Sequence, residues 1–332
     1  MPSCLVTGAT GFLGTNLVNH LVQQGWTVRA SGSRAEATPY LQDMGVEYVA
    51  ADITDADQCL NLVKGCDVVF HVAGDTSFWK PLYARQRAIN VDGSRNIAEA
   101  CVKHGVRRLI HTSTADVFGY SEDGQPVDET TGYFNYLRMG YNYGETKQEA
   151  DSIMRSYKSP SLDVILIHPG FMIGPFDHTL QIGSIFFELK EGKVPAFPPG
   201  GSSFCDVEEV AKAHIMAATR GRSGESYICA GMPHSNLSLA DMFGRMAKAI
   251  DITPPKWVMP EWAWIGYAYG CEFIARFTGN APQINPGQAR YMAKHQRYDS
   301  SKAIAELGYK VPPVEDGIKA SLAWYRSNGY SI

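Results

Sequence analysis

The sequence predicts an α/β fold in which a doubly wound parallel sheet carries a smaller, helix-rich C-terminal lobe. Two observations predict it. Short β-branched runs alternate with helix-length stretches through the first half of the 332-residue chain, and crossovers of this length carry helices over both faces of a parallel sheet. After Pro169 the alternation loosens, and the segment 192–201 is too rich in proline and glycine to form a regular element.

The individual elements follow from these patterns in chain order. Apolar, β-branched runs predict strands at 4–7, 27–31, 47–50, 68–71, 109–112 and 164–168. The stretches between them predict helices at 13–24, 55–64, 84–104 and 143–157. In the second half we expect a strand at 227–230 and helices at 207–220, 238–250, 261–277, 286–296 and 315–326.

Composition and charge exclude several classes of protein. Hydrophobic residues make up 45% of the chain, which predicts a globular core, and the net charge of −4 predicts no nucleic-acid partner. The seven cysteines are odd in number and lack metal-ligand spacing. We therefore expect reduced thiols, no metal site and a cytoplasmic location. No secretion signal opens the sequence, and the apolar stretch 262–271 is too short to span a membrane.

A glycine-rich loop lies between the first strand and the first helix. Gly8 permits a tight turn, Gly11 lets the backbone approach a pyrophosphate, and Gly14 lets the helix pack closely on the strand. Free N–H groups at the helix N-terminus then bind the phosphates, so the loop predicts a Rossmann dinucleotide site. The expected domains are 1–170 for the dinucleotide, with part of 205–235 returning to it, and 171–332 mainly for the substrate.

The end of the second strand favours NADP over NAD. An acidic residue there would accept hydrogen bonds from the ribose 2′-OH, but this chain has Ser31 and Ser33 between Arg29 and Arg34. Either arginine can pair with a 2′-phosphate. The alternatives are that both arginines are ordinary surface charges, and that the nearby Glu36 selects NAD.

Asp52 follows the third strand and has two interpretations. Its carboxylate either accepts a hydrogen bond from the adenine amino group or shares a helix-capping role with Asp55.

A phenol and an ammonium lie four residues apart on the helix at 143–157. Tyr143 and Lys147 project from one face of that helix, and the ammonium is expected to lower the pKa of the phenol and to hold the nicotinamide ribose. The strand at 109–112 runs into three consecutive hydroxyl residues, 112–114, at the carboxyl edge of the sheet. A hydroxyl there can bind the oxygen of a substrate.

Taken together, these motifs resemble the extended short-chain dehydrogenase/reductase family. That family includes sugar-nucleotide epimerases, dihydroflavonol reductases and 3β-hydroxysteroid dehydrogenases, and the pattern is closest to the latter two. The resemblance covers almost the whole chain. Its matching segments are 7–14, 52–53, 71–74, 90–93, 112–114, Tyr143 with Lys147, Pro169 with 173–175, and 204–211.

The resemblance implies roles for individual residues. Tyr143 would be the general acid/base, Lys147 its electrostatic partner and ribose ligand, and Thr114 the hydroxyl that orients the substrate oxygen, with Ser113 as the alternative. His168 stands where many relatives carry arginine, and its alternative interpretation is a buried strand-end histidine. The residues expected at the cofactor are Gly8, Thr10, Gly11, Phe12, Leu13, Gly14, Ser31, Ser33, Arg34, Asp52, Ile53, Val72, Ala73, Gly74, Asn90, Lys147, His168 and Pro169.

The substrate branch is indicated by departures from the sugar-nucleotide pattern. The pair 202–203 is Ser-Ser where epimerases usually carry arginine, and the pair 170–171 replaces a frequent asparagine. Aromatic residues crowd the segments expected around the substrate: Phe78, Trp79, Phe134, Tyr136, Phe171, Phe176, Phe186, Phe187, Phe197, Phe204, Trp262 and Trp264. Apolar walls suit a hydrophobic substrate.

We therefore expect an NADP(H)-dependent oxidoreductase that interconverts a hydrophobic ketone or aldehyde and its alcohol. The alternatives are an NAD-dependent sugar-nucleotide epimerase or dehydratase and a non-catalytic dinucleotide sensor. Relatives often pair through helices such as 84–104 and 143–157, which implies a homodimer. The helix at 261–277 is either a lid or packing helix, or an interfacial helix at a membrane.

Overall fold

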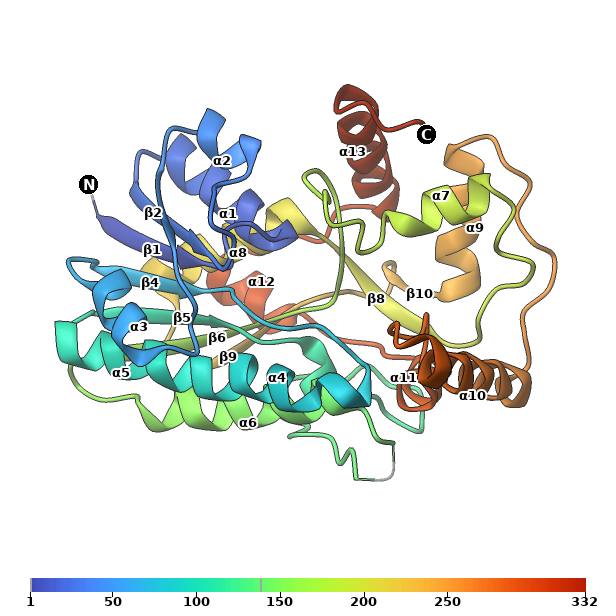
Figure 1. Ribbon diagram of the computed structural model, residues 1–332, viewed down its shortest axis with the longest axis horizontal. Coiled ribbons are helices and arrows are strands. Elements are labelled where there is room, and N and C mark those ends of the chain that lie inside the picture. Colours follow the sequence, from blue (N-terminus) through green and yellow to red (C-terminus); the bar gives the residue numbers. More distant parts are fainter. Residues whose placement is uncertain (1, 138) are drawn as a thin grey trace.

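The computed structural model describes residues 2–137 and 139–332. Seven parallel strands form the main sheet in the order β3-β2-β1-β4-β5-β6-β9 (Figure 1). Because the strand order reverses between β1 and β4, the crossover helices cover both faces. The strands are β1 (Ser3–Thr7), β2 (Thr27–Gly32), β3 (Glu47–Ala50), β4 (Val68–His71), β5 (Arg108–Thr112), β6 (Asp163–Pro169) and β9 (Ser226–Cys229). The doubly wound sheet expected from the sequence is confirmed.

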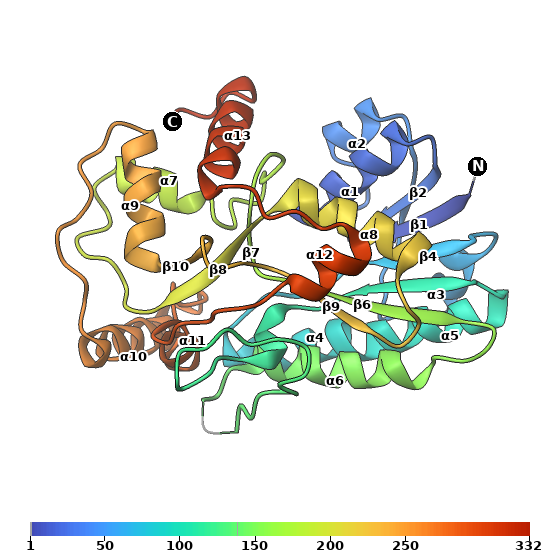
Figure 2. The ribbon, with the colours of Figure 1, turned by 180° about the vertical axis from the view of Figure 1, so that it is seen from behind.

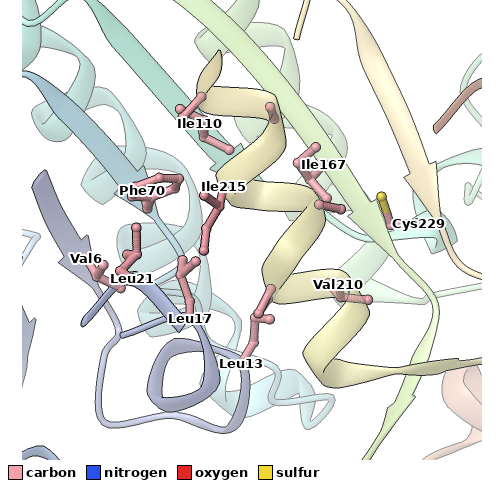
Figure 3. Packing of buried hydrophobic residues seen from close by; sticks show 14 of the residues in the cluster. Val6, Leu13, Leu17, Leu21, Phe70, Ile110, Ile167, Val210, Ile215 and Cys229 are labelled. Atoms are coloured by element: carbon pink, nitrogen blue, oxygen red, sulfur yellow. The ribbon is translucent and has the colours of Figure 1, made fainter. Parts of the chain in front are cut away.

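Two helical layers enclose this sheet (Figure 2). One face is covered by α1 (Phe12–Gln23), α8 (Val207–Arg220) and α12 (Ser301–Leu307), and the other by α3 (Ala56–Val63), α5 (Ser94–His104) and α6 (Asn142–Ser156). Figure 3 shows the first layer, where Leu17 of α1 and Ile215 of α8 pack over Phe70 and Ile110 of the sheet. The short helix α2 (Pro39–Asp43) follows β2.

The helix expected at 84–104 is interrupted. It consists of α4 (Tyr83–Arg87), a π-helical turn at Ala88–Gly93, and α5. Such wider turns insert an extra residue into a helix and often occur at functional sites. Here the turn contains Asn90, whose buried side chain faces the loop after β4.

The lobe contains a second sheet that the sequence analysis missed. Its order is β10-β8-β7, and its strands are β7 (Phe171–Ile173), β8 (Gly201–Asp206) and β10 (Asn236–Ser238). Two of them are only three residues long, too short for a recognisable alternation of polar and apolar residues. The helices of the lobe are α7 (Ser184–Lys190), α9 (Leu239–Ala249), α10 (Glu261–Thr278), α11 (Pro286–Met292) and α13 (Val314–Ser327). The helix expected to reach residue 296 thus ends at Met292.

The chain passes repeatedly between the main sheet and the lobe. After β6 it builds β7, α7 and β8, and it then returns to the main sheet as α8 and β9. After α11 it returns once more as α12, which packs against α8 and β9, before α13 ends in the lobe (Figure 2).

The helix α10 is the most exposed apolar element of the lobe. Trp262 and Phe277 expose 79% and 77% of their surface, and Phe273 exposes 62%. Within the part of the chain that the structure describes, no helix is long and apolar enough to cross a membrane.

Candidate active site

A cavity of about 430 Å³ lies at the carboxyl ends of the main-sheet strands. Its volume is within the range of small-molecule sites, roughly 300–1,000 Å³. The cavity is lined by all but two of the residues expected at the cofactor and by the three expected catalytic residues. The exceptions among the described residues are Asn90 and His168. Lining residues that the sequence analysis did not expect at the cavity include Gly32, Ala51, Thr76, Ile89, Gly170, Met172, Thr179 and Gln181. Gly32 lies in β2, Ile89 in the π-helical turn and Met172 in β7, and the others lie in loops that no sequence pattern marks as adjacent.

The glycine loop leaves no room for side chains. A Cβ on Gly8, whose φ is +65°, would lie 2.7 Å from the backbone of Ala73, and a Cβ on Gly14 would overlap the carbonyl oxygen of Gly8. Gly11 is the N-cap residue of α1, and no side-chain hydrogen bond among the described residues caps that helix. The first-turn amides are therefore available to an anion, so the loop fits the pyrophosphate of a dinucleotide.

The two arginines that follow the loop have different surroundings. Arg34 lines the cavity together with Ser31 and Ser33. Arg29 points elsewhere, because its guanidinium donates to the carbonyl oxygens of Leu62 and Lys64 at 2.9 Å and pairs with Glu47. The interpretation of Arg29 as a phosphate ligand is therefore wrong.

Asp52 and Asp55 divide the two roles proposed for Asp52. Asp55 caps α3 by accepting from the amides of Asp57 and Gln58. Asp52 lines the cavity, and its Oδ1 accepts from the Thr54 amide at 2.9 Å and the Thr54 hydroxyl at 2.8 Å. The carboxylate of Asp52 is thereby held at the cavity wall, with a second oxygen able to accept from a ligand.

Thr7 and His71 hold the loop after β4 through hydrogen bonds. The Thr7 hydroxyl accepts from the amides of Val72 and Ala73 at 3.2 Å, so it donates its proton to Nδ1 of His71 at 2.8 Å. Burial is the largest cause that lowers the pKa of His71 well below its usual value. His71 is thus a neutral support under the loop that lines the cavity.

Asn90 fixes the next part of the same loop. Its Oδ1 accepts from the Asp75 amide at 2.7 Å, and its Nδ2 donates to the Asp75 carbonyl at 3.0 Å and to the Thr146 hydroxyl at 3.1 Å. Asn90 therefore ties the loop beside Gly74 to α6 without lining the cavity.

Lys147 joins α6 to the end of β5. Its Nζ donates to the carbonyl oxygen of Thr112 at 2.7 Å and lies 3.9 Å from the position of a Cβ on Gly74. Burial lowers the pKa of Lys147 to about 8, and the charge of Asp151 opposes that decrease. Lys147 lines the cavity, and its side chain gains or loses its proton close to neutral pH.

The environment of Tyr143 differs from the expectation. Burial raises the pKa of its phenol, the charges of Asp116 and Asp151 raise it further, and the Thr114 side chain lowers it. The decrease expected from Lys147 is not found, because Lys147 is not among the groups that shift this pKa. Tyr143 and the Thr114 hydroxyl nevertheless meet at the cavity wall, where the two groups can act on one oxygen atom.

Two polar residues near Thr114 are committed to other partners. The hydroxyl of Ser113 donates to Oδ2 of Asp151 at 2.9 Å. His168 is fully buried, and its ring nitrogens pair with the Thr114 carbonyl at 3.2 Å and the Ser226 hydroxyl at 2.6 Å. Its position corresponds to the buried strand-end interpretation and not to a cofactor contact.

Only some of the expected aromatic residues surround Tyr143. The Phe78 ring meets the Tyr143 ring edge-on at 5.7 Å, and Phe134 and Tyr136 belong to the same cluster. By contrast, the rings at 186, 197 and 204 lie in the lobe core. Their expected place in the substrate cleft is wrong, because they pack between α7, α9 and the second sheet.

Comparisons with known proteins give a consistent grouping. A model described as the NAD dependent epimerase/dehydratase family matches residues 4–230. A putative dihydroflavonol 4-reductase from Synechocystis sp. is 30% identical over 99% of this chain and 96% of its own. Sterol demethylase protein B from Methylococcus capsulatus is 27% identical over 98% of each chain. The crystal structure of a nucleoside-diphosphate-sugar epimerase from Pseudomonas aeruginosa has a TM-score of 0.80 at 22% identity, covering 100% of this chain and 99% of that one.

Proposed function

The chain belongs to the NAD-dependent epimerase/dehydratase family, and within it we propose an NADP(H)-dependent reductase or dehydrogenase for a hydrophobic ketone, aldehyde or alcohol. The observation that carries this proposal is the junction of Tyr143, Thr114 and Lys147 at the end of the cavity that the glycine loop opens. The aromatic cluster beside Tyr143 supplies an apolar wall.

In this proposal the glycine loop would hold the dinucleotide, and its nicotinamide would supply or take up the hydride. Tyr143 protonates the carbonyl oxygen of the substrate during reduction, and it accepts the hydroxyl proton during oxidation. The Thr114 hydroxyl orients that oxygen toward the phenol. Lys147 stabilises the phenolate that forms when the proton has left and holds the ribose next to Gly74.

The preference for NADP rests on Arg34 and Ser33. Both line the cavity at the end of β2, where no acidic side chain follows the strand before Glu36. A guanidinium there would pair with a 2′-phosphate, whereas NAD requires an acceptor for the 2′-OH.

The hydrophobic substrate is supported by the names of two relatives, a dihydroflavonol reductase and a sterol demethylase protein. A sugar nucleotide is the second candidate, since the neighbour from Pseudomonas aeruginosa is named a nucleoside-diphosphate-sugar epimerase. An enzyme of that kind retains NAD through its reaction, so mass spectrometry of the purified protein separates the two candidates.

The third candidate, a dinucleotide sensor without catalysis, requires the Tyr143 phenol to have no role.

For assembly we propose a homodimer through α5 and α6, the helices by which relatives often pair. Light scattering, with and without a charge placed at the exposed Val102 of α5, tests this contact.

The decisive experiment compares Tyr143→Phe with wild type on a panel of ketones, aldehydes and sugar nucleotides, each with NADPH and with NADH. Turnover should fall by about 10²–10⁴-fold while cofactor affinity changes little. Tyr157→Phe is the matched control, because Tyr157 lies at the far end of α6 with its hydroxyl on Glu99. Equal turnover of wild type and Tyr143→Phe would disprove the assignment.

A further inference from the structure

A group of buried polar side chains lies around Asp151 of α6, and only Ser113 among them lines the cavity in the described chain. Asp151 lies one helical turn after Lys147 in α6 and is 0% exposed. A carboxylate buried to this degree needs compensating partners, because desolvation of a charge is costly.

Oδ2 of Asp151 has two hydrogen-bond donors. The Ser113 hydroxyl donates to it at 2.9 Å and the Tyr133 hydroxyl at 3.3 Å. Ser113 also lines the cavity, and Tyr133 is 39% exposed. The carboxylate thus links a hydroxyl of the cavity wall to one at the protein surface.

Oδ1 of Asp151 is less well satisfied. It lies 3.4 Å from Nε2 of His111, without the geometry of a hydrogen bond. Among the described residues, neither that oxygen nor either ring nitrogen of His111 has a hydrogen-bond partner. His168 approaches Oδ2 from β6 at 3.8 Å. The hydrogen bonds alone therefore leave part of the cost of burying this carboxyl uncompensated.

The titratable groups around the Asp151 carboxyl differ in whether they are charged near pH 7. Burial lowers the pKa of His111 and of His168, so both imidazoles are neutral near pH 7. Burial raises the pKa of Asp151 itself. That increase is opposed by His168, by Lys147 one turn before Asp151, by the Ser113 hydroxyl and by Arg155 one turn after it. The neutral imidazoles of His71 and His111 face Lys147. Asp151 is the carboxylate that raises the pKa of Lys147.

We propose that Asp151 is a positioning residue of the active site: its carboxylate fixes the Ser113 hydroxyl in the cavity wall and keeps the Lys147 ammonium protonated at neutral pH. The effect on turnover rests on the function proposed above. The effect on Lys147 does not, because it is a property of the protein alone.

Asp151→Asn tests the proposal, since the amide keeps an oxygen for Ser113 and removes the charge. Competitive acetylation of the cofactor-free protein over a pH series, read by peptide mass spectrometry, gives the titration of Lys147. Loss of a nearby negative charge should move its midpoint down on the order of one pH unit. Asp151→Glu should restore the wild-type midpoint. If the midpoint in folded Asp151→Asn equals that of wild type, the proposal is wrong.

The matched control is Glu129→Gln. Glu129 is a partly buried carboxyl that accepts from the Ile228 amide at 2.7 Å and does not line the cavity in the described chain. It should leave the Lys147 midpoint unchanged, and an equal shift in this control would contradict the proposal. Should Asp151→Asn fail to fold, Asp151→Ser also removes the carboxylate charge and should lower the Lys147 midpoint by a similar amount. No movement there would overturn the proposal.

The activity profile is a second readout. If the proposed function also holds, the alkaline limb of kcat against pH moves down with the Lys147 midpoint in Asp151→Asn. A shifted acetylation midpoint in a protein that reduces no substrate supports the role of Asp151 and contradicts only the proposed function.

Discussion

Lys147 donates a hydrogen bond of 2.7 Å from Nζ to the main-chain oxygen of Thr112. Through this contact the helix that carries Tyr143 is joined to the strand that leads into Thr114. The same ammonium is buried, which lowers its pKa from 10.5 to about 8. The group that assembles the site therefore also opposes folding.

The pH dependence of stability should expose this cost. Between pH 8 and 10.5 the unfolded chain keeps the Lys147 proton while the folded protein has lost it, so the free energy of unfolding rises with pH in that window. Relative to Lys147→Met, wild type should gain about 1–3 kcal/mol between pH 7.5 and pH 10. Urea unfolding of both proteins at the two pH values measures the difference. Lys310→Met is the control, because Lys310 is exposed. The difference in the free energy of unfolding between wild type and Lys310→Met should be the same at both pH values, and a gain like that of Lys147→Met would contradict the interpretation.

Gly14→Ala should destabilise the protein by at least about 2 kcal/mol and remove dinucleotide binding, because its Cβ would overlap the Gly8 carbonyl oxygen. Gly244→Ala is the control, since Gly244 lies in α9 with open space around its Cβ position. That change should stabilise by about 0.5–1 kcal/mol. Thermal unfolding and NADPH fluorescence titration measure both effects, and a Gly14→Ala protein that still binds NADPH would contradict the close approach of loop and helix.

Arg34→Ala should raise the KM for NADPH by roughly 10–100-fold and leave that for NADH unchanged, as expected for the loss of a charged hydrogen bond. Arg29→Ala should lower stability without changing the ratio of the two KM values, because Arg29 binds Leu62, Lys64 and Glu47. Initial rates with both cofactors test the pair. If Arg34→Ala leaves the ratio as it is, NAD becomes the preferred assignment.

Phe78→Ala should raise the KM for hydrophobic substrates by roughly tenfold or more with little effect on the KM for NADPH, because its ring forms part of the apolar wall beside Tyr143. Phe273→Ala, on the exposed face of α10, should change neither value. Steady-state kinetics on the best substrate of the panel distinguishes them. A larger loss in Phe273→Ala would place the substrate against α10 instead.

The parts of the site that the sequence predicted depend on local spacing. The glycine loop is recognised from three closely spaced glycines between the first strand and the first helix. Tyr143 and Lys147 are recognised from their spacing of one helical turn. The cavity brings both motifs together because parallel strands end at one edge of the sheet. These motifs needed no knowledge of long-range packing.

The parts that the sequence missed depend on contacts between distant segments. Asp151 is recognisable only once Tyr133 and the end of β5 pack against α6. Arg29 and Arg34 look equivalent in the sequence, and only the end of α3 takes Arg29 away from the cavity. No residue type in the sequence marks the π-helical turn around Asn90, so the sequence predicted one continuous helix.

The repeated passage of the chain between the main sheet and the lobe limits how this protein can be recombined. The lobe consists of three separate stretches, β7 to β8, β10 to α11, and α13, with α8, β9 and α12 of the main sheet between them. A truncation after β9 would expose the surface on which α12 lies. A chimera that borrows the substrate lobe of a relative therefore needs several grafts made together, and no single crossover point would transfer specificity.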